Sequence, residues 1–378
     1  MEKVIIVTHE FTPFRGGAAT YAEELAAALH RLGRPVEVWT ADYGADSTKD
    51  DFAFPVRRLS AGGSLRVPHM FQFTRELWER REQLEHATVL LASVGAHMAF
   101  MILVSFTQIR SQCIVPLLHG SEALRFRRNP IWRLLARRFY RQVDRVATVS
   151  RFSKSLLEQS RLLPSSRPII LAPGACSSAA ARLVSDEAKR DGPIRILTLA
   201  RVHPRKGQLE TARALALLPP ELRCKIIYSV AGTGDSSYLE RVEKTCRDAG
   251  VAFEYLGLIE ADSIATVYAH CDIYAMTSRT LRRSVEGFGI TYLEAGFHGK
   301  PVVAYRTGGA SEAVIDGETG LLVEEGNLQG LSDVFSRLIR EPALRERLGS
   351  AGRRHAAQFS WDATARALLG EGTPSLRA

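Results

Sequence analysis

The chain has 378 residues, of which 46% are hydrophobic and 24% are charged, a composition that excludes a disordered protein and supplies enough apolar residues for sizeable cores. Its length predicts two or three domains, because a single core stops growing beyond about 250–300 residues. The formal net charge of +9 favours anionic partners, without choosing among nucleotides, nucleic acids and lipid headgroups.

The five cysteines argue against a disulfide framework or a zinc site, because they are widely spaced and form no Cys-x-x-Cys pair: Cys113, Cys176, Cys224, Cys246 and Cys271. They favour a reducing compartment. The N-terminus lacks a signal-peptide pattern, so we expect a cytoplasmic protein that is at most peripheral at a membrane. No Asp-x-Asp motif follows a strand-like segment, so neither a catalytic metal nor a cofactor is expected.

The N-terminal half alternates between strand-like and helix-like segments, which predicts a doubly wound parallel α/β sheet. Strands are expected at 4–8, 36–40, 88–93, 113–118, 145–150 and 168–173. After the first strand, Gly16 and Gly17 precede a helix with apolar residues at Tyr21, Leu25 and Leu29. Two glycines before a helix let backbone approach a phosphate, although a plain turn is an equal interpretation.

The apolar run at 88–107 is long enough to span a bilayer. Because Gly95 and His97 interrupt it and a strand-like segment follows, we interpret it as a buried strand, a break at Gly95 and a buried helix. A membrane span remains the alternative. His119 follows the strand at 113–118, where ligands bind in parallel sheets, although a packed structural histidine is the commoner role.

A basic segment follows, with aromatic and aliphatic residues between its arginines: Arg125, Arg127, Arg128, Arg133, Arg137, Arg138, Arg141 and Arg145. The spacing of Arg133, Arg137, Arg141 and Arg145 predicts one helical stripe. The segment from Arg125 to Arg145 would suit an anionic membrane surface, or equally a solvated helix face above core aromatics. No nucleic-acid partner is expected, because no recognisable binding module accompanies the charge.

The domain boundaries are expected around a stretch rich in Pro, Ser, Ala and Gly. We expect an N-terminal domain at 1–173, a linker at 174–192 and a second αβ domain at 193–355, with strands at 194–200, 225–231, 252–257, 272–278 and 301–305. A C-terminal helix within 356–378 is expected to pack back on the N-terminal domain.

Three loops of the second half contain cations or glycines directly after strand-like segments. Arg201 and Lys206 in RVHPRKG could neutralise a diphosphate, although a basic surface turn is the commoner role of such residues. Gly232 in AGTGD could let a nucleoside approach closely, and Gly257 and Leu258 lie in the segment LGLI.

The segment EGFGITYLEA at 286–295 combines a glycine loop, a helix start and two carboxylates. The helix from Ile290 would direct free N–H groups at the loop, which suits an anion or hydroxyls. Glu286 could accept hydrogen bonds from sugar hydroxyls, and Glu294 from two ribose hydroxyls. A helix start with one solvated glutamate is an equal interpretation from the residues alone.

EGFGITYLEA resembles the signature of retaining glycosyltransferases of family four, and the block at 301–323 resembles the next block of that family. The resemblance covers most of the C-terminal half and extends to the Gly16–Gly17 loop, His119 and SRFS at 150–153. It implies an α/β, GT-B fold: two Rossmann-like domains facing across a cleft. Ala200 stands where the family has glycine, whereas Arg201, Lys206 and Gly207 match.

The resemblance also implies residue roles. Backbone groups of Gly257 and Leu258 would bind the base of the nucleotide. Glu286 and His119 would contact the donor sugar, and Glu294 would hold the ribose. The backbone of Phe288, Gly289 and Ile290 would contact the sugar and the diphosphate. Gly16 and Gly17 would lie close to the donor phosphates and the acceptor. The acceptor belongs to the N-terminal half in such enzymes, where loop position suggests three candidates: Arg15, Tyr21 and Arg151.

The implied reaction is retaining, metal-independent transfer of a hexose from a UDP- or GDP-sugar to a hydroxyl of a glycan, lipid-linked or small-molecule acceptor. The acceptor hydroxyl would attack on the face from which the diphosphate departs. A catalytically inactive GT-B module that binds a glycan or partner, and a nucleotide-sugar epimerase of the same fold, are the alternatives. A dinucleotide oxidoreductase is disfavoured because neither half contains GxGxxG.

Overall fold

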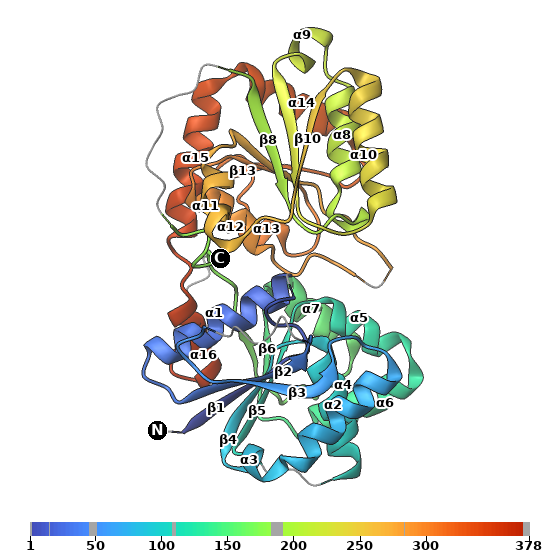
Figure 1. Cartoon of the computed structure of the whole chain (residues 1–378), viewed down its shortest axis with the longest axis vertical. Helices are drawn as coiled ribbons and strands as arrows, with labels where there is room; N and C mark the ends of the chain where they lie inside the picture. The colour runs from blue at the N-terminus through green and yellow to red at the C-terminus, as the bar shows by residue number, and fades with distance from the viewer. Residues whose placement is uncertain are drawn as a thin grey trace. The chain divides into compact units, whose positions relative to one another are not determined.

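The computed structural model describes residues 2–14, 16–44, 51–107, 111–182, 192–282 and 284–372. The chain forms two compact units (Figure 1). Unit 1 comprises Met1–Gly174 and Ser360–Ala378, and unit 2 comprises Ala175–Phe359. Each unit has a parallel sheet and a hydrophobic core of its own.

Unit 1 contains a seven-stranded sheet of order β3-β2-β1-β4-β5-β6-β7 in which all neighbouring strands run parallel. Its strands are β1 Lys3–Val7, β2 Val36–Asp42, β3 Val56–Gly62, β4 Ala87–Leu91, β5 Cys113–Leu118, β6 Val146–Thr148 and β7 Ile169–Leu171. Its helices are α1 Gly17–Arg31, α2 Val67–Glu79, α3 Arg81–Glu85, α4 Val94–Phe106, α5 Ser121–Arg128, α6 Pro130–Tyr140, α7 Arg151–Ser160 and α16 Trp361–Leu369.

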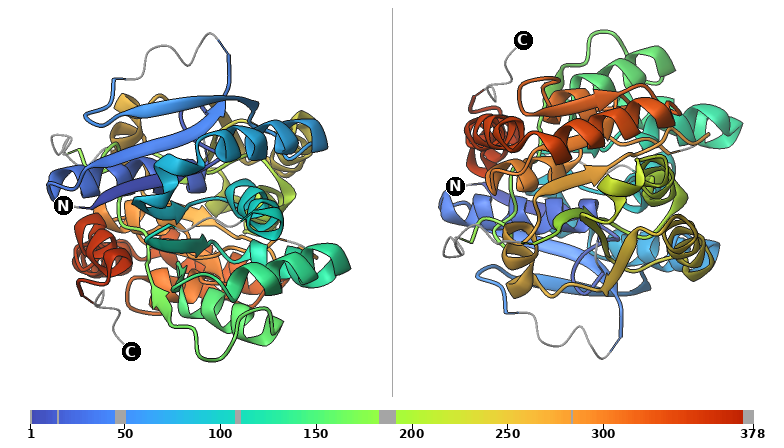
Figure 2. Two further views of the ribbon diagram at one scale, coloured as in Figure 1. Left: turned by 90° about the horizontal axis from the view of Figure 1, so that it is seen from below. Right: turned by 90° about the horizontal axis from the view of Figure 1, so that it is seen from above.

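The helices of unit 1 cover both faces of its sheet. Helices α1 and α16 lie on one face, and α2, α4 and α6 lie side by side on the other (Figures 1 and 2). Right-handed crossovers produce this arrangement, because the chain leaves β1 in one direction along the sheet and leaves β4 in the other. The loops after β1 and β4 therefore diverge at the carboxyl edge, which is where ligands bind in such sheets.

The C-terminal helix α16 belongs to unit 1 through specific contacts. The Ser360 side chain caps its first turn by accepting from Ala363 N. Thr364 Oγ1 donates to the Pro173 carbonyl at 2.7 Å, and the Trp361 ring lies edge-on to Tyr21, with the centroids 4.9 Å apart. Asp362 also pairs with Arg31 of α1 at 2.7 Å.

Unit 2 contains a six-stranded parallel sheet of order β10-β9-β8-β11-β12-β13. Its strands are β8 Ile194–Leu199, β9 Ile226–Ala231, β10 Ala252–Gly257, β11 Ile273–Met276, β12 Val302–Tyr305 and β13 Gly320–Val323. Its helices are the 3₁₀ turn η2 Pro204–Lys206, α8 Gln208–Ala216, α9 Pro220–Arg223, α10 Ser236–Ala249, α11 Ala261–Ala269, α12 Ile290–Phe297, α13 Ala310–Ala313, α14 Leu328–Arg340 and α15 Pro342–Ala356. The strand order reverses between β8 and β11.

The predicted parallel α/β class is confirmed, and every predicted strand is present. Strands β3 and β13 were not predicted from the sequence. The break expected at Gly95 is wrong, because Gly95 lies inside α4. A Cβ at this position would come within 2.5 Å of the His9 ring, so the glycine makes room for His9.

The predicted arginine stripe holds only for Arg133 and Arg137, which lie on α6. It is wrong beyond them, because α6 ends at Tyr140, Arg141 is its C-cap residue, and Arg145 lies between the helix and β6. Asn129 begins α6 by accepting from the backbone N–H groups of Ile131 and Trp132. Within the described ranges, no helix is long and apolar enough to cross a membrane.

Candidate active site

The loops after β8 and β11 meet at the carboxyl edge of the unit 2 sheet, where its strand order reverses. The first loop contains Arg201, Arg205 and Lys206, and the second runs from Thr277 to Gly289. In open α/β sheets this position is the common ligand site, because the two loops diverge and leave backbone groups accessible. The predicted residues of the second half therefore gather where the topology favours binding.

The Glu286 carboxylate binds three neighbouring side chains at this edge of the sheet. Its Oε2 atom accepts from Lys206 Nζ at 2.7 Å, from Arg205 Nη1 at 2.8 Å and from Ser278 Oγ at 3.0 Å. The side chain of Glu286 is only 10% exposed, and those of Lys206 and Arg205 are 15% and 11% exposed. Two buried cations thus share one carboxylate, which leaves an excess positive charge suited to a further anion.

The electrostatic environment shifts both members of the pair. Burial acts to raise the pKa of Glu286, but the charges and hydrogen bonds of Lys206 and Arg205 outweigh it and hold the pKa well below its usual value of 4.5. Burial lowers the pKa of Lys206 to about 8, with the Glu286 carboxylate opposing the shift and the Arg205 guanidinium adding to it. At neutral pH, Glu286 is ionised and Lys206 is protonated.

Glycine contacts fix both loops. Gly207, with φ +76°, lies so close to Thr277 that a Cβ would come within 1.9 Å of the Thr277 carbonyl oxygen. Thr277 Oγ1 donates to the Gly207 carbonyl at 2.7 Å. Gly309 N donates to the Glu286 carbonyl at 2.9 Å, and a Cβ on Gly309 would come within 2.0 Å of the Gly287 carbonyl oxygen. The TGG segment after β12 therefore supports the backbone of Glu286 and Gly287.

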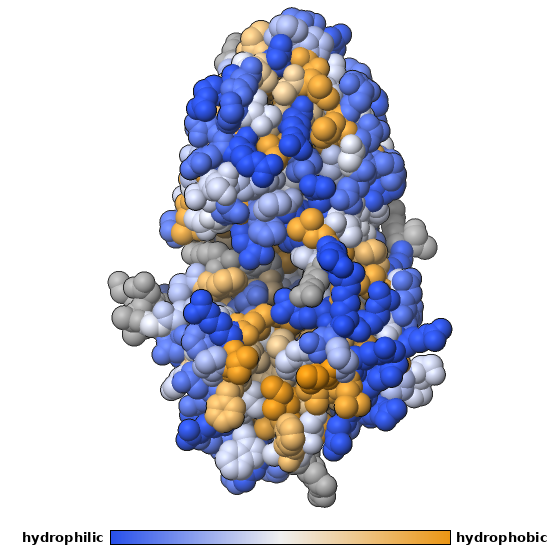
Figure 3. Space-filling view, turned by 90° about the vertical axis from the view of Figure 1, so that its right-hand side faces the viewer, coloured by the Kyte–Doolittle hydropathy of each residue, from blue (hydrophilic) through white to orange (hydrophobic). Residues whose placement is uncertain are grey.

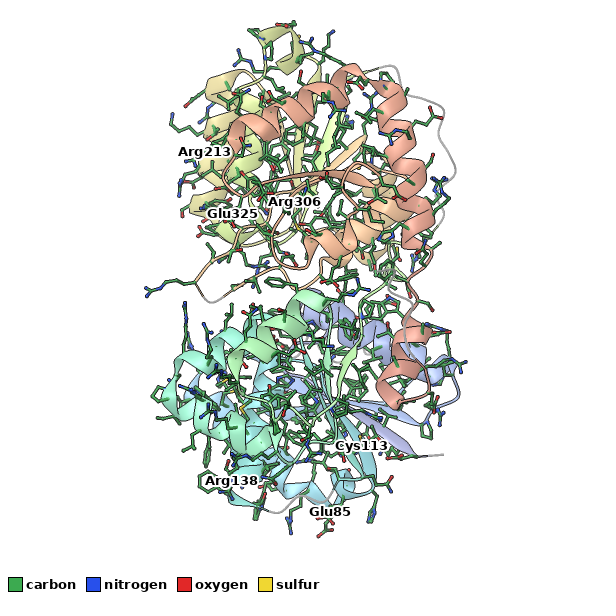
Figure 4. All side chains as sticks on the ribbon, turned by 180° about the vertical axis from the view of Figure 1, so that it is seen from behind. Glu85, Cys113, Arg138, Arg213, Arg306 and Glu325 are labelled. Atoms are coloured by element: carbon green, nitrogen blue, oxygen red, sulfur yellow. The ribbon has the colours of Figure 1, made fainter. Side chains whose placement is uncertain are left out.

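Ion pairs connect the segments that follow β11, β12 and β13 at this edge of the sheet. Arg279 pairs with Glu210 of α8 at 2.9 Å and with Glu325 at 3.7 Å. Arg306 pairs with Glu324 at 3.0 Å and Asp316 at 2.5 Å. Figure 4 shows Arg306 and Glu325 near one another where β12 and β13 end.

Helix α12 begins at Ile290, as predicted, and Gly289 precedes it with φ +93°. No described side chain caps this helix start, and Tyr292 N donates to the Gly289 carbonyl at 3.0 Å, so the N–H groups of Ile290 and Thr291 are the ones open to a ligand. Phe288 is buried and packs against the Phe359 ring. The helix start and the Arg205–Lys206 pair are held by the same Glu286 loop.

Glu294 lies one turn inside α12 and is buried. Its Oε1 accepts from Ser177 Oγ at 2.5 Å and its Oε2 from Tyr268 OH at 2.8 Å. Burial raises the pKa of Glu294 above its usual 4.5, and the hydrogen bonds from Ser177 and Tyr268 act in the opposite direction. The carboxylate is thereby oriented with each oxygen on one hydroxyl, a pattern that two ribose hydroxyls would reproduce.

The predicted nucleoside loops adjoin one another. Gly232 N donates to the Gly257 carbonyl at 2.7 Å. Gly232 has φ +124°, and a Cβ there would come within 2.2 Å of the Ala200 carbonyl oxygen. Leu258 follows Gly257 and is 49% exposed. The loops after β8, β9 and β10 are thus packed backbone against backbone, which by itself explains the glycine at 232.

The predicted Arg201 does not join the Glu286 cluster in this structure. Its side chain is exposed, and its carbonyl accepts from Gln208 Nε2 at 3.0 Å. Arg205 contacts Glu286 instead, although the sequence reasoning did not select it. The sequence did contain a signal for Arg205, because it stands directly beside the selected Lys206 and both precede Gly207. Ser278, Ser177 and Tyr268 were also missed, because only the tertiary fold brings them to the two glutamates.

In unit 1 the predicted residues lie along the carboxyl edge of the sheet or near it. His119 Nε2 donates to the Ala92 carbonyl at 3.0 Å, and its ring meets Tyr21 edge-on. Gly16 precedes α1, and Gly17 is its first residue rather than a loop residue. Arg151 is the exposed first residue of α7, and Arg15 lies outside the described residues.

The loop position expected for Tyr21 is wrong. Tyr21 lies in the second turn of α1 and is 1% exposed, and its hydroxyl donates to the Ala172 carbonyl at 2.8 Å. It belongs to the core between His119 and Trp361. The apolar spacing with Leu25 and Leu29 already indicated this buried face.

His9 is an edge residue of unit 1 that the sequence reasoning missed. It follows β1, is buried, and has Ser93 Oγ 2.7 Å from its Nδ1. Burial, together with the Arg125 charge, lowers the pKa of His9 to about 4, so it is neutral at physiological pH. Over the described ranges, no three His, Cys, Asp or Glu side chains form a group suited to a metal ion.

Comparisons with known proteins identify both halves. Residues 181–355 match the family model of glycosyl transferases group 1, and residues 16–174 match the glycosyl transferase 4-like domain. The chain is 30% identical over 374 residues to the GDP-mannose-dependent alpha-(1-6)-phosphatidylinositol monomannoside mannosyltransferase of Mycolicibacterium smegmatis, covering 95% of this chain and 94% of that protein.

Two solved structures share the fold. Sucrose-phosphate synthase from Thermosynechococcus elongatus matches with a TM-score of 0.82 at 19% identity, covering 98% of both chains. HepE from Anabaena, solved with UDP and glucose, matches with a TM-score of 0.75 at 21% identity over 98% of this chain and 99% of that chain. The GT-B fold implied by the sequence is therefore confirmed.

Both domain models, the full-length relative and the shared fold agree with the family indicated by EGFGITYLEA, and we conclude that this chain belongs to the retaining glycosyltransferases of family four and is a hexosyltransferase.

Proposed function

We propose that the chain transfers a hexose with retention from a nucleoside-diphosphate sugar to a hydroxyl of a lipid-linked acceptor. One observation carries the proposal: Lys206 and Arg205 converge on the single Glu286 carboxylate beside the uncapped start of α12. A diphosphate carries the charge that would balance these cations. GDP-mannose and an inositol-containing lipid are the first substrates to test, because the full-length relative is named for them.

In the proposed reaction, the bond between the anomeric carbon and the diphosphate oxygen breaks, and the acceptor oxygen bonds to that carbon on the same face. The acceptor proton passes to the departing diphosphate, so no separate base or metal is required. Lys206 and Arg205 stabilise the charge that develops on the leaving group, with Arg201 on the same loop. Such interactions strengthen as the bond breaks, which is what accelerates the chemical step.

We assign the two glutamates separate tasks. Glu286 contacts the donor sugar and also holds Lys206 and Arg205 in place until the diphosphate arrives. Glu294 takes the ribose hydroxyls in exchange for Ser177 and Tyr268. The backbone of Phe288, Gly289 and Ile290 binds the sugar and diphosphate.

Further contacts remain proposals of the same kind. Gly232, Gly257 and Leu258 are proposed to approach the nucleoside. In unit 1, His119 is proposed to contact the donor sugar, Gly16 and Gly17 its phosphates, and Arg151 with Arg15 the acceptor. We do not propose Tyr21 as an acceptor contact, because its side chain is buried in the core. An anionic membrane surface is proposed as a partner of the segment from Arg125 to Arg145.

The test is a melting experiment with GDP, UDP, ADP and pyrophosphate, followed by donor hydrolysis without acceptor. We expect GDP or UDP to raise the melting temperature and the matching sugar nucleotide to be hydrolysed slowly. A protein whose melting temperature responds to neither GDP nor UDP lacks the proposed donor site. Rearranged sugar nucleotide, in place of free sugar, would favour an epimerase.

A further inference from the structure

Unit 1 has a groove lined mainly by arginines on its helical face. Its volume is about 330 Å³, and Pro130 and Leu134 form its apolar part. Four arginines line the rest: Arg127, Arg128, Arg133 and Arg137. They come from the end of α5 and from α6. Arg138, on the same helix, is exposed (Figure 4). We call this feature the basic groove.

Large hydrophobic side chains are exposed on the same face of unit 1. Val67 and Phe71 on α2 are 82% and 70% exposed, and Phe106 at the end of α4 is 82% exposed. Ile131 and Leu134 on α6 are 67% and 70% exposed. Helix α4 packs against both α2 and α6, so these residues lie on three neighbouring helices. Figure 3 shows hydrophobic side chains on this side of unit 1, beside hydrophilic ones.

Helix α2 has several exposed apolar residues along one edge. Val67, Phe71 and Trp78 are separated by four and seven residues, which places them on one side of the helix. The adjoining side, roughly a quarter turn away around the helix axis, is buried through Met70, Phe73 and Leu77. Helix α2 thus has one wide apolar face, and the core covers only part of it. We call the exposed set Val67, Phe71, Trp78, Phe106, Ile131 and Leu134 the apolar ridge.

The charge of this face is concentrated beside the apolar ridge. Residues 121–145 contain eight arginines and two acidic residues, a formal net charge of +6 out of +9 for the chain. Among the described residues, Arg127, Arg133 and Arg138 form no ion pair with an acidic side chain, and Arg137 donates only to the Arg161 carbonyl. On α2 and at its C-terminal cap, in contrast, Arg75 pairs with Glu79 and Arg80 with Glu76.

We infer that unit 1 docks on an anionic phospholipid bilayer through the basic groove and the apolar ridge. The arginines would bind lipid phosphates, and the aromatic and aliphatic side chains would enter the boundary between headgroups and acyl chains. This deepens the lipid part of the proposed function by naming the surface, but it rests on unit 1 alone. The membrane-binding surface is also larger than the basic segment predicted from the sequence, because it includes the exposed apolar residues of α2 and of the end of α4.

The same features disfavour other occupants. A second copy meeting this face across a two-fold axis would bring two basic grooves together without acidic partners. A nucleic acid would bind the arginines through its phosphates but would leave the apolar ridge in water. Only a partner with both anionic groups and an apolar layer matches the two features at once.

Vesicle co-sedimentation of the full chain tests the inference. We expect binding to vesicles of equal parts phosphatidylcholine and phosphatidylglycerol, weakening with added salt, and little binding to phosphatidylcholine alone. Arg133→Gln with Arg137→Gln should lower the partition constant about 25-fold, since each arginine near the surface contributes about fivefold. Phe71→Ser with Leu134→Ser should lower it at least about tenfold.

Matched controls lie on unit 2. Arg213→Gln with Arg241→Gln removes two exposed arginines there, and Leu217→Ser removes an exposed leucine (Figure 4 labels Arg213). Both should bind vesicles like the wild type. The melting temperature without ligand checks that each variant folds, and the ridge and groove positions are too exposed to support the core.

Several results would overturn the inference. One is a wild-type chain that binds neither kind of vesicle, and another is binding of the groove and ridge variants to vesicles as strongly as the wild type. A third such result is a dimer in solution that Phe71→Ser with Leu134→Ser dissociates. Binding of soluble glycerol phosphate without vesicle binding would also overturn it, in favour of a site for free anions. Failure of the nucleotide melting test would leave the vesicle result unaffected, so the two proposals fail separately.

Discussion

Lys206 Nζ lies 2.7 Å from Glu286 Oε2, although 80 residues separate the two in the chain. Arg205 binds the same oxygen atom, and neither cation is more than 15% exposed on its side chain. A buried ion pair of this kind contributes less to stability than its geometry suggests, because burial removes hydration from every charge. Its excess of one positive charge is therefore better understood as preparation for an anion.

Glu286→Gln should separate binding from turnover. Loss of the carboxylate charge leaves Lys206 and Arg205 buried without an anion, which should cost about 3 kcal/mol of stability. GDP or UDP should restore much of the lost stability, because its diphosphate supplies the missing charge, while turnover should be lost. Melting curves with and without nucleotide, together with a transfer assay, measure both effects.

The matched control is Glu324→Gln, which breaks an ion pair with Arg306 that is mostly exposed. That substitution should change stability by no more than about 1 kcal/mol. Full turnover by Glu286→Gln would refute the role assigned to Glu286.

Nucleotide affinity should depend on pH through Lys206. The protonated form binds the diphosphate, and burial lowers the pKa of Lys206 in the free protein to about 8. Affinity should therefore be constant between about pH 7 and pH 8, where the terminal phosphate of the nucleotide is fully ionised, and fall by up to about tenfold per pH unit above pH 8. Lys206→Arg should remove this dependence, because a guanidinium stays charged throughout that range. Calorimetric titration across pH 8 measures it, and parallel curves for both proteins would contradict the assignment.

Glu294 and the Lys206 cluster should respond differently to two ligands. Glu294→Gln should weaken binding of GDP or UDP about tenfold, the usual effect of losing a hydrogen bond to a charged group, and leave pyrophosphate binding unchanged. Lys206→Gln should weaken both. Ser177→Ala should resemble a mild form of Glu294→Gln, because Ser177 orients the carboxylate. Equal losses for pyrophosphate and nucleotide in Glu294→Gln would exclude a ribose contact.

The loop that supports Glu286 should be intolerant of a single methyl group. Gly309→Ala places a Cβ within 2.0 Å of the Gly287 carbonyl oxygen, so the Glu286 loop must move. We expect a loss of about 2 kcal/mol in stability and a larger loss of turnover. Gly192→Ala is the control, since no described atom lies within 4 Å of its Cβ position, and it should change stability by less than about 0.5 kcal/mol. Unchanged kinetics in Gly309→Ala would refute the supporting role.

The low pKa of Glu286 also predicts acid sensitivity. The folded-state pKa lies below the usual 4.5, so the ion pairs stabilise the fold above pH 4.5, and this contribution is lost as pH falls below that value. The wild-type melting temperature should fall more steeply than that of Glu286→Gln as the pH drops below 4.5. If the melting temperatures of the two proteins fall equally with pH, the ion pairs of the Glu286 carboxylate do not stabilise the fold.

The sequence by itself determined the class of fold and most of its elements, and it supplied the residues that we propose for the donor site. Alternating apolar strands and amphipathic helices depend on contacts within a few residues, so β1, α1 and α12 could be predicted locally. The motif EGFGITYLEA also specified Glu286 and Glu294 as a pair. Short buried strands such as β13, with only four residues, have too weak a period to be recognised.

Only the tertiary structure decided which groups meet. Parallel strands bring their carboxyl ends to one edge, and there the turn at Pro204–Lys206 brings Arg205 rather than Arg201 to Glu286. The fold also brings Ser177 and Tyr268 to Glu294. Packing also assigned Tyr21 to the core and ended the arginine stripe at Tyr140. The physical reason is the same in each case. The partners of a side chain depend on strand order and on burial, which bring together residues that are far apart in the chain. Local periodicity gives information only about the helix or strand in which it occurs.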